Sequence, residues 1–204
     1  MEENKIVEYR GIRGLVGAIL KQDDRETLTY GEVFEIAGVS ELTKNSSDST
    51  DVHHYDNKGA VGLNVQGEDE VNVNVSAIPL KVIAKMTGQT YDEKTGALVE
   101  GPSNVPYMAI GYITTDTDGT DMYVWRLKGM FTRPGSTHKT IDKGTSADGQ
   151  SLKYTGITTN KKFVSNKNQG GNATVVPAQT CGKTEMEFFA TVQTPDDIIT
   201  AETE

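Results

Sequence analysis

Cysteine is almost missing from this chain. Cys181 is the sole cysteine among 204 residues, so no intrachain disulfide framework can form. This excludes the small secreted modules whose fold depends on several disulfides, and we expect the protein to fold in a reducing cytoplasm.

Basic charge and long apolar runs are also scarce. The 20 lysines and arginines stand against 29 aspartates and glutamates, for a formal net charge of -9. A protein that grips nucleic acid with its whole surface needs a dense basic face, so that class is excluded. The first ten residues, MEENKIVEYR, are polar and acidic, and no apolar run approaches the roughly 20 residues of a membrane-spanning helix. We therefore expect neither an export signal nor a membrane segment.

Fingerprints of catalysis and of metal binding are absent as well. His53 and His54 lie in the stretch DVHHYD, but adjacent side chains of an extended segment point to opposite sides and no second ligand cluster follows. The stretch DTDGTD resembles a calcium loop, yet Leu127 stands where an EF-hand needs a bidentate glutamate. Cys181 has no recognisable catalytic partner. We predict that the protein is not an enzyme and binds no metal or cofactor.

What the chain does have is the composition of short strands joined by turns. It contains 21 glycines together with many threonines, valines, asparagines and serines. Residues 15–21 and 32–42 are predicted to be two antiparallel strands on either side of a polar turn. Residues 70–76, EVNVNVS, alternate valine with asparagine and serine, which predicts one buried and one wet face. We expect a mostly β chain that forms a single domain over residues 1–204.

One segment carries the signals of a helix. Pro79 suits a first helical position, Ile83 and Ala84 follow at helical spacing, and Gly88 stands where a C-terminal cap belongs. These signals predict a short helix over residues 79–87, laid on a sheet.

Residues 106–131, PYMAIGYITTDTDGTDMYVWRLKGMF, are predicted to form a β-hairpin. The Asp-Gly pair of TDTDGT suits the positive φ angles of a two-residue turn. In the second strand, alternation turns Val124, Arg126 and Lys128 to one face and a stripe of large side chains to the other. The stripe consists of Tyr123, Trp125, Leu127 and Phe131. We predict that it belongs to the core and is not an exposed aromatic binding platform.

Two long polar stretches, residues 43–70 and 132–150, are predicted to be loops that serve assembly, since long loops in a compact domain usually have a function. Their surroundings differ in charge. Residues 41–70 hold seven acids and two bases, a balance of -5, and residues 126–167 hold nine bases and two acids, a balance of +7. If the two regions lie at opposite ends, the molecule has an acidic and a basic end that pair when copies stack head to tail.

Three blocks of sequence carry a family resemblance. They are GIRGLVGAIL near the start, SAIPLKVIAKMTGQTYDEKTGALVE in the middle and PYMAIGYITTDTDGTDMYVWRLKGMFTRPGSTHKT after it. In this order they closely resemble the major tail proteins that build the tail tube of long-tailed bacteriophages and prophages of Gram-positive bacteria. The likeness is strongest over residues 71–140. Residues 163–184 depart from it, since they are longer and richer in asparagine and glycine than the last hairpin of that family.

The resemblance implies a β-sandwich or partly closed barrel of two packed sheets with one short flanking helix. It implies that subunits form a hexameric ring, that rings stack into a tube, and that phage DNA passes through the lumen without specific binding. The implied partners are further copies of the chain and the tape-measure, tail terminator and tail tip proteins, in a virion assembled in the host cytoplasm. A net charge of -9 agrees with a conduit that repels phosphates.

The polar stretches supply the residues that we expect at subunit and ring contacts. From the first stretch these are Asp48, Asp51, His53, His54, Tyr55 and Asp56, and from the second they are Arg133, His138, Lys139 and Lys143. We also expect flexible arms at both ends, an N-terminal arm over residues 1–8 and an acidic C-terminal arm over residues 193–204.

A second function class stays open at this point. A carbohydrate-binding or adhesive β-sandwich of a phage or cell surface would expose Trp125 and its neighbouring tyrosines as a platform that stacks on sugars. The two hypotheses differ in the burial of Trp125. Its position beside Leu127, at strand period, favours burial and therefore the tube protein.

Overall fold

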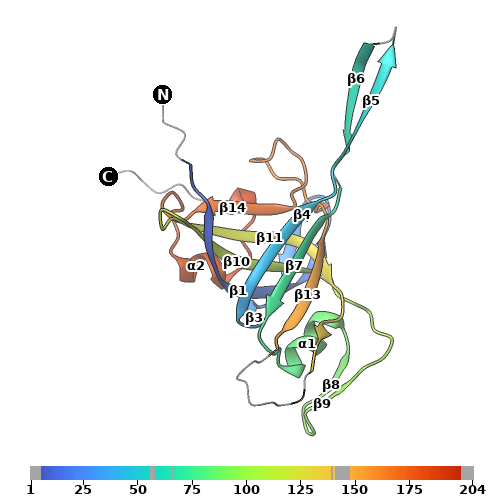
Figure 1. Cartoon of the computed structure of the whole chain (residues 1–204), viewed down its shortest axis with the longest axis vertical. Coiled ribbons are helices and arrows are strands. Elements are labelled where there is room, and N and C mark those ends of the chain that lie inside the picture. The colour runs from blue at the N-terminus through green and yellow to red at the C-terminus, as the bar shows by residue number, and fades with distance from the viewer. Residues whose placement is uncertain (1–5, 56–57, 66, 139, 141–147, 199–204) are drawn as a thin grey trace.

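Strands dominate the structure of the protein, a computed structural model that describes residues 6–55, 58–65, 67–138, 140 and 148–198. Strand residues far outnumber helical residues in the described part of the chain, which confirms the predicted mostly β class. Figure 1 shows the elements along the chain. They are β1 (Tyr9–Asp23), β2 (Leu28–Tyr30), β3 (Phe34–Glu35), β4 (Val39–Ser46), β5 (Ser49–Tyr55), β6 (Lys58–Val65), β7 (Asp69–Val75), α1 (Leu80–Thr87), β8 (Thr90–Asp92), β9 (Ala97–Val99), β10 (Met108–Asp116), β11 (Asp121–Phe131), β12 (Gly135–Ser136), β13 (Gln150–Gly156), β14 (Ala173–Pro177), α2 (Glu185–Ala190) and the 3-10 helix η1 (Pro195–Asp197).

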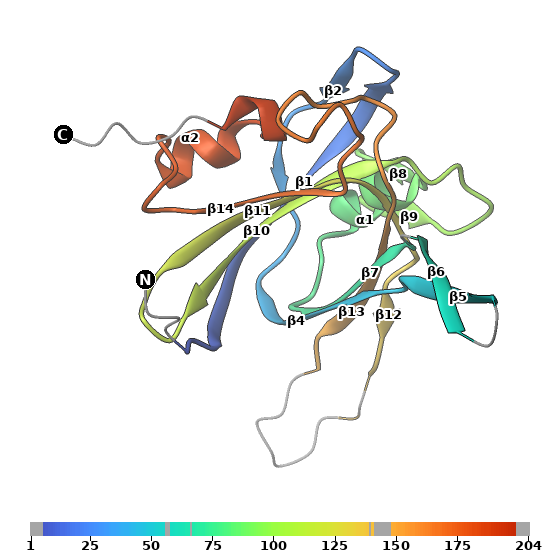
Figure 2. The ribbon, with the colours of Figure 1, turned by 90° about the horizontal axis from the view of Figure 1, so that it is seen from above.

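Most strands belong to one antiparallel sheet of ten strands, in the order β2-β1-β10-β11-β13-β7-β4, with β3 added to β1, β12 to β13 and β14 to β11. β5 with β6, and β8 with β9, form separate two-stranded sheets. In Figure 2 the large sheet folds over, so that β14, β11, β10 and β1 face β13, β7 and β4. It does not close into a barrel, because no ladder joins β4 to β1 among the described residues.

β11 is the central strand of the core and is buried on both faces. Tyr123, Trp125 and Leu127 lie in one hydrophobic cluster, which Phe188 of α2 also joins. Val124 lies in a second cluster on the opposite face. Trp125 and Leu127 are each 0% exposed, which confirms that the aromatic stripe belongs to the core.

Phe131 is buried as predicted, but it does not share a face with the rest of the stripe. Arg126 pairs with Ile110, whereas Gly129 pairs with Met108, so β11 holds an extra residue in between. Such a bulge shifts the alternation of side chains by one position. Phe131 therefore packs in the second cluster, against a tyrosine of β13 whose ring centroid is 5.2 Å away.

The alternation predicted for residues 70–76 is confirmed in β7. Val71, Val73 and Val75 are 0%, 1% and 2% exposed, while the side chain of Asn74 is exposed on the other face. Period-two burial of this kind is what a strand with one covered face requires.

The predicted helix is α1 (Leu80–Thr87), which buries Ile83 and Ala84 and ends at Gly88 with a φ of 68°. A Cβ at this glycine would lie 2.1 Å from the carbonyl oxygen of Asn104. Both the left-handed backbone and the close approach therefore require glycine at the helix end.

The strands predicted over residues 15–21 and 32–42 are only partly correct. The first lies inside β1, but the second is split. β3 pairs with β1, whereas β4 crosses to the other half of the sheet and pairs with β7. Ile36 and Ala37, between them, are buried in the core. Because the partner of β4 lies about 30 residues further along the chain, no local pattern could indicate this pairing.

The prediction of a loop over residues 43–70 is wrong, because this segment is largely strand. It contains the end of β4, all of β5 and β6, and the start of β7. The hydrogen bonds of a ladder join backbone groups, so polar strands can pair as well as apolar ones. Such polar strands lack the hydrophobic alternation by which a strand is predicted from sequence.

The turn of the β10–β11 hairpin is longer than the two residues predicted, since residues 117–120 join the strands. Asp116 Oδ1 accepts hydrogen bonds from the N–H groups of Asp118 and Thr120 at 2.9 and 2.8 Å. Gly119 has the predicted positive φ, 82°. The side chain of Asp116 therefore closes a wider loop than an Asp-Gly pair alone indicates.

The prediction of a flexible C-terminal arm over residues 193–204 is wrong for residues 193–197. Gln193 and Thr194 are 4% and 6% exposed, and η1 follows them directly. Asp197 accepts from the N–H of Thr194 at 2.9 Å and closes a cap there. Residues 199–204 lie outside the described part of the chain.

The burial of Trp125 predicts its fluorescence. The indole is 0% exposed and donates to the carbonyl oxygen of Phe188 at 3.2 Å. We expect blue-shifted emission from the folded protein that iodide does not quench, and red-shifted, quenchable emission after denaturation. Quenching of the folded protein at the rate of a free indole would contradict this placement of the side chain.

Candidate assembly interfaces

β5 and β6 form an arm that extends away from the body of the molecule (Figure 1). The two strands pair with each other and with no other described strand. A two-stranded hairpin alone is at best marginally stable in water. An arm of this length is therefore expected to gain stability by binding to a partner surface.

Most of the contact residues predicted from the first polar stretch lie on this arm. Those on β5 are Asp51, His53, His54 and Tyr55. The ladder shifts register between the two histidines, at a local irregularity of the arm. Asp48 lies at its base, where Oδ1 accepts from the N–H of Gly67 at 3.0 Å. Asp56 lies outside the described residues.

A buried ion pair that the sequence did not reveal holds the base of the arm. Asp69 Oδ2 lies 2.9 Å from Arg126 Nη1, and each side chain is 10% exposed. Asp69 Oδ1 accepts from the hydroxyl of Ser46 at 3.0 Å and lies 3.1 Å from Lys44 Nζ. Arg126 Nε donates to the hydroxyl of Tyr112 at 3.2 Å, whose pKa is raised chiefly by burial. The carboxylate thus joins β4, β7 and β11 at the point where the arm begins.

This network corrects the predicted separation of charge into an acidic and a basic end. Asp69 belongs to the acidic region and Arg126 to the basic region, yet they pair within one molecule. Glu70 and Lys153, again one from each region, lie 2.6 Å apart. Both regions meet along the sheet because β7 lies next to β13, so part of the charge that was expected to attract neighbouring copies is neutralised internally.

The arm and the second polar stretch nevertheless lie at opposite ends of β7. Ser46 pairs with Asp69 at the arm end, and Gln150 pairs with Val75 at the other end. The seven residues of β7 span roughly 20 Å at the rise of a β-strand. The subunit therefore presents two different surfaces in opposite directions.

Two further predicted contact residues, Arg133 and His138, lie near the end of β7 opposite the arm, next to β12. Arg133 Nη2 donates to the carbonyl oxygen of Gly101 at 2.5 Å, and His138 is exposed. Lys139 and Lys143 lie outside the described residues. A polar pocket of about 460 Å³ opens here, and its lining includes Ser40, Asn74, Gly135, Ser136, Gln150 and Ser151.

The sheet also has open edges. Among the described strands, β4 pairs only with β7, and β14 pairs only with β11. The outer backbone groups of such strands are free to pair with another chain. β14 ends at Pro177, a residue that cannot donate to a ladder and is therefore typical of edge strands.

A groove of about 880 Å³ lies between the two halves of the sheet. Its walls are residues 9–12 of β1 and residues 40–44 of β4. Its floor comes from β10, β11 and β14 and consists of Tyr112, Thr114, Met122, Val124, Arg126 and Val175. Along this wall β10 is the only described strand that pairs with β1, because β3 begins to pair only at Val16. Both walls are thus strands with one unpaired edge.

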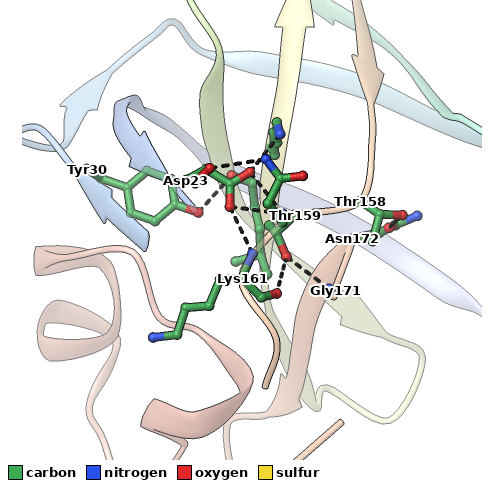
Figure 3. A network of polar contacts seen from close by, with 10 residues as sticks. Asp23, Tyr30, Thr158, Thr159, Lys161, Gly171 and Asn172 are labelled. Carbon is green, nitrogen blue, oxygen red and sulfur yellow. Dashed lines mark hydrogen bonds and ion pairs between the residues drawn. The ribbon is translucent and has the colours of Figure 1, made fainter. Parts of the chain in front are cut away.

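A polar cluster around Asp23 anchors the loop between β13 and β14 (Figure 3). The Asp23 carboxylate accepts from Lys128 Nζ at 2.6 Å and from the N–H groups of Asn160 and Lys161 at 2.9 and 3.0 Å. The Tyr30 hydroxyl donates to a carbonyl oxygen of β11 at 2.8 Å. Burial, together with the charge of Asp23, raises the Tyr30 pKa far above its usual value. These groups form hydrogen bonds and an ion pair with one another, which indicates that they stabilise the fold and do not form a reactive centre.

The same loop is tied at several further points. The N–H of Gly171 donates to Thr159 Oγ1 at 3.0 Å, and Thr158 Oγ1 donates to Asn172 Oδ1 at 2.6 Å (Figure 3). Asp196 accepts from two backbone N–H groups of the loop at 2.9 and 3.2 Å. Hydrogen bonds therefore fix the asparagine- and glycine-rich part of this loop both to its own residues and to η1.

Within the described ranges, no three histidine, cysteine, aspartate or glutamate side chains gather as a metal site requires. Cys181 is 6% exposed and packs in the cluster of Trp125. Across the same part of the chain, no helix has the length and apolar character needed to cross a membrane. That the protein has no enzymatic activity and no cofactor stays a prediction.

Comparison with known proteins leaves the family open. No family model matches the chain. A search of curated proteins also found no match. The resemblance to phage tail proteins over residues 71–140 is therefore a hypothesis, and the function has to be argued from the arm, the open edges and the groove.

Proposed function

We propose that the protein is a structural subunit that polymerises with copies of itself into stacked rings and so forms the tube of a phage tail. The main support for this proposal is the arm, because β5 and β6 extend from the body and pair with no other described strand. A different surface lies at the opposite end of β7. Head-to-tail stacking needs two such unlike surfaces facing in opposite directions. The motif resemblance to major tail proteins supports the same function.

The rings are proposed to form through the open sheet edges. Among the described strands β14 has a free outer edge, and this edge can pair by backbone hydrogen bonds with a strand other than β4 of the next copy. A heterologous contact of this kind closes into a ring when the rotation between copies divides a full turn. Six subunits in a ring follow from the resemblance alone.

Stacking is proposed to place the arm of one ring against the polar pocket of the next ring. The pocket of about 460 Å³ lies at the end of β7 that faces away from the arm. The tip of the arm is proposed to seat in it, alongside the exposed His138. Docking would supply the tertiary support that an isolated hairpin lacks.

The tube would serve as a conduit through which phage DNA passes during ejection. A formal charge of -9 suits this role, since acidic groups near the lumen repel phosphates over a screening length of about 8 Å at physiological salt. The proposed partners are further copies of the chain and the tape-measure, tail terminator and tail tip proteins of the virion.

Electron microscopy of the purified protein at high concentration, with its mass in solution measured alongside, tests the proposal. Rings or hollow tubes with regular axial striations are the expected result. A strict monomer at every concentration, also after addition of preformed tail tips, would overturn it.

The strength of stacking is expected to fall with salt. Raising the salt from about 0.1 to about 1 M shortens the screening length from about 10 to about 3 Å. Because charged residues that are proposed to meet at the stacking contact would then attract each other less, tubes should become shorter in micrographs. Ring diameter should stay constant, since backbone pairing joins the subunits within a ring. Tubes of unchanged length would contradict the electrostatic part of the stacking.

The carbohydrate-binding alternative depended on an aromatic platform. Trp125 and Tyr123 are 0% and 7% exposed, so this stripe offers no stacking surface to a sugar. Specific binding to a glycan by a protein that forms no rings would restore that alternative.

A further inference from the structure

The groove between β1 and β4 is an open binding surface that the stacking of rings does not use. Its floor is largely apolar, and Val175 there is 54% exposed. Exposed apolar surface of this kind, bordered by unpaired strand edges, typically receives an extended polypeptide that adds a strand to the sheet.

The rim of the groove is basic, although the chain as a whole is acidic. Arg10 and Lys44 stand on opposite walls, and Arg126 lies on the floor. Lys44 and Arg126 share the single carboxylate of Asp69, and Glu41 is the acid of the lining. The groups in and under the groove therefore carry more positive than negative charge, which favours a segment with acidic side chains.

The N-terminal segment of the chain has the matching chemistry. Its sequence MEENKIVE contains three glutamates, one lysine and the apolar pair Ile6 and Val7. Ile6 is 94% exposed and Val7 is 45% exposed, so this pair is not buried in the subunit to which it belongs. Glu8 exchanges two hydrogen bonds with Thr117, at 2.8 and 3.2 Å, and this fixes the exit of the segment at the β10–β11 turn.

We propose that residues 1–7 of a neighbouring copy lie extended in this groove and pair with the free edge of β4. Seven extended residues span roughly 23 Å, which is close to the length of the eight residues of β4. Strand alternation turns Ile6 onto the apolar floor and Glu2 to the same face, which also holds Arg126, while Glu3 and Val7 face the opposite side. This exchange rests on the proposed self-assembly, because a polymer brings a second copy within reach of the groove.

Disulfide trapping between copies tests the exchange. Full-length Ile6→Cys protein is mixed under assembly conditions with a second full-length variant. This second variant carries Thr43→Cys on the β4 wall of the groove or Val175→Cys on its floor. We expect at least one of these pairs to form mixed dimers ten or more times faster than a control pair with Val164→Cys, which is 78% exposed outside the groove. Wild-type protein supplies the background rate of the buried Cys181.

The outcomes separate this proposal from the proposed function. Tubes without preferential trapping in the groove would overturn the exchange and leave the tube standing. Disulfide formation within one chain of an Ile6→Cys/Val175→Cys variant would assign the groove to the N-terminal segment of the same chain and so overturn the exchange. Faster trapping of the groove cysteines by Thr50→Cys on the arm would assign the groove to the arm and would also overturn it. Absence of any polymer would overturn the proposed function itself.

A substitution in the segment gives an independent measure. Ile6→Asp is expected to raise the protein concentration needed for assembly at least tenfold, with an unchanged circular dichroism spectrum, because Ile6 is 94% exposed in the subunit. Val164→Asp, at a similarly exposed position, is expected to assemble like the wild type. Equal behaviour of the two variants would count against a role of the segment in assembly.

Discussion

A variant whose arm is removed is expected to form no tubes while its body stays folded. Residues 49–66 are replaced by Asn-Gly, so that a short turn joins β4 to β7. Because β5 and β6 pair with no other described strand, the melting temperature should stay within about 4 °C of the wild type, which corresponds to roughly 1 kcal/mol for a chain of this size. Micrographs and thermal unfolding followed by circular dichroism measure the two effects.

The control for the arm deletion is Met186→Asp. Met186 is 84% exposed on α2, away from the arm, and this variant should form normal tubes. Normal tubes from the deletion variant would show that stacking does not depend on the arm. A large loss of thermal stability would show instead that the arm supports its own body.

Removal of the charge of Asp69 is expected to destabilise the fold strongly. In Asp69→Asn, the guanidinium of Arg126 stays 10% exposed without the carboxylate that lies 2.9 Å from it. Breaking a buried ion pair from one side costs about 3–5 kcal/mol, which corresponds to a melting temperature lower by roughly 6–20 °C. Chemical and thermal denaturation of the purified variant measure the loss.

An exposed ion pair of the same protein is the matched control. Lys81 Nζ and Glu93 Oε1 lie 2.6 Å apart, but their side chains are 67% and 73% exposed. Glu93→Gln should therefore cost no more than about 1 kcal/mol. The double variant Asp69→Asn/Arg126→Met should recover part of the loss of Asp69→Asn, since the unpaired charge is then gone. Equal effects of Asp69→Asn and Glu93→Gln would show that burial does not strengthen the Asp69 pair.

The short-range features of the fold could be predicted because they depend on neighbouring residues. The alternation of Val71, Val73 and Val75 sets the buried face of β7. Ile83 at helical spacing, with Gly88 after the last turn, sets the extent of α1. Trp125 alternates with Tyr123 and Leu127 on one face of β11, and this pattern indicates its place in the core.

The predictions that the structure contradicts concern features that depend on long-range pairing. The bulge in β11 moved Phe131 to the other face, and an inserted residue leaves no trace in a hydrophobic pattern. The strand pair of the arm was mistaken for a loop because residues 43–70 are polar throughout much of their length. Of the candidate contacts, Asp51, His53, His54 and Tyr55 lie on β5, and their role in assembly stays a prediction. The groove is not predictable from sequence because its walls, β1 and β4, meet only in the folded chain.

The sequence by itself determined the mostly β class, the position of α1, the burial of the aromatic stripe and the net charge of -9. Each of these follows from local periodicity or from composition. Only the tertiary structure decided that Asp69 neutralises Arg126 across β7 and β11, that the arm points away from the second polar stretch, and that β4 and β1 leave the sheet open. These features arise from contacts between residues far apart in the chain, and their energies depend on burial and register that no single stretch of sequence contains.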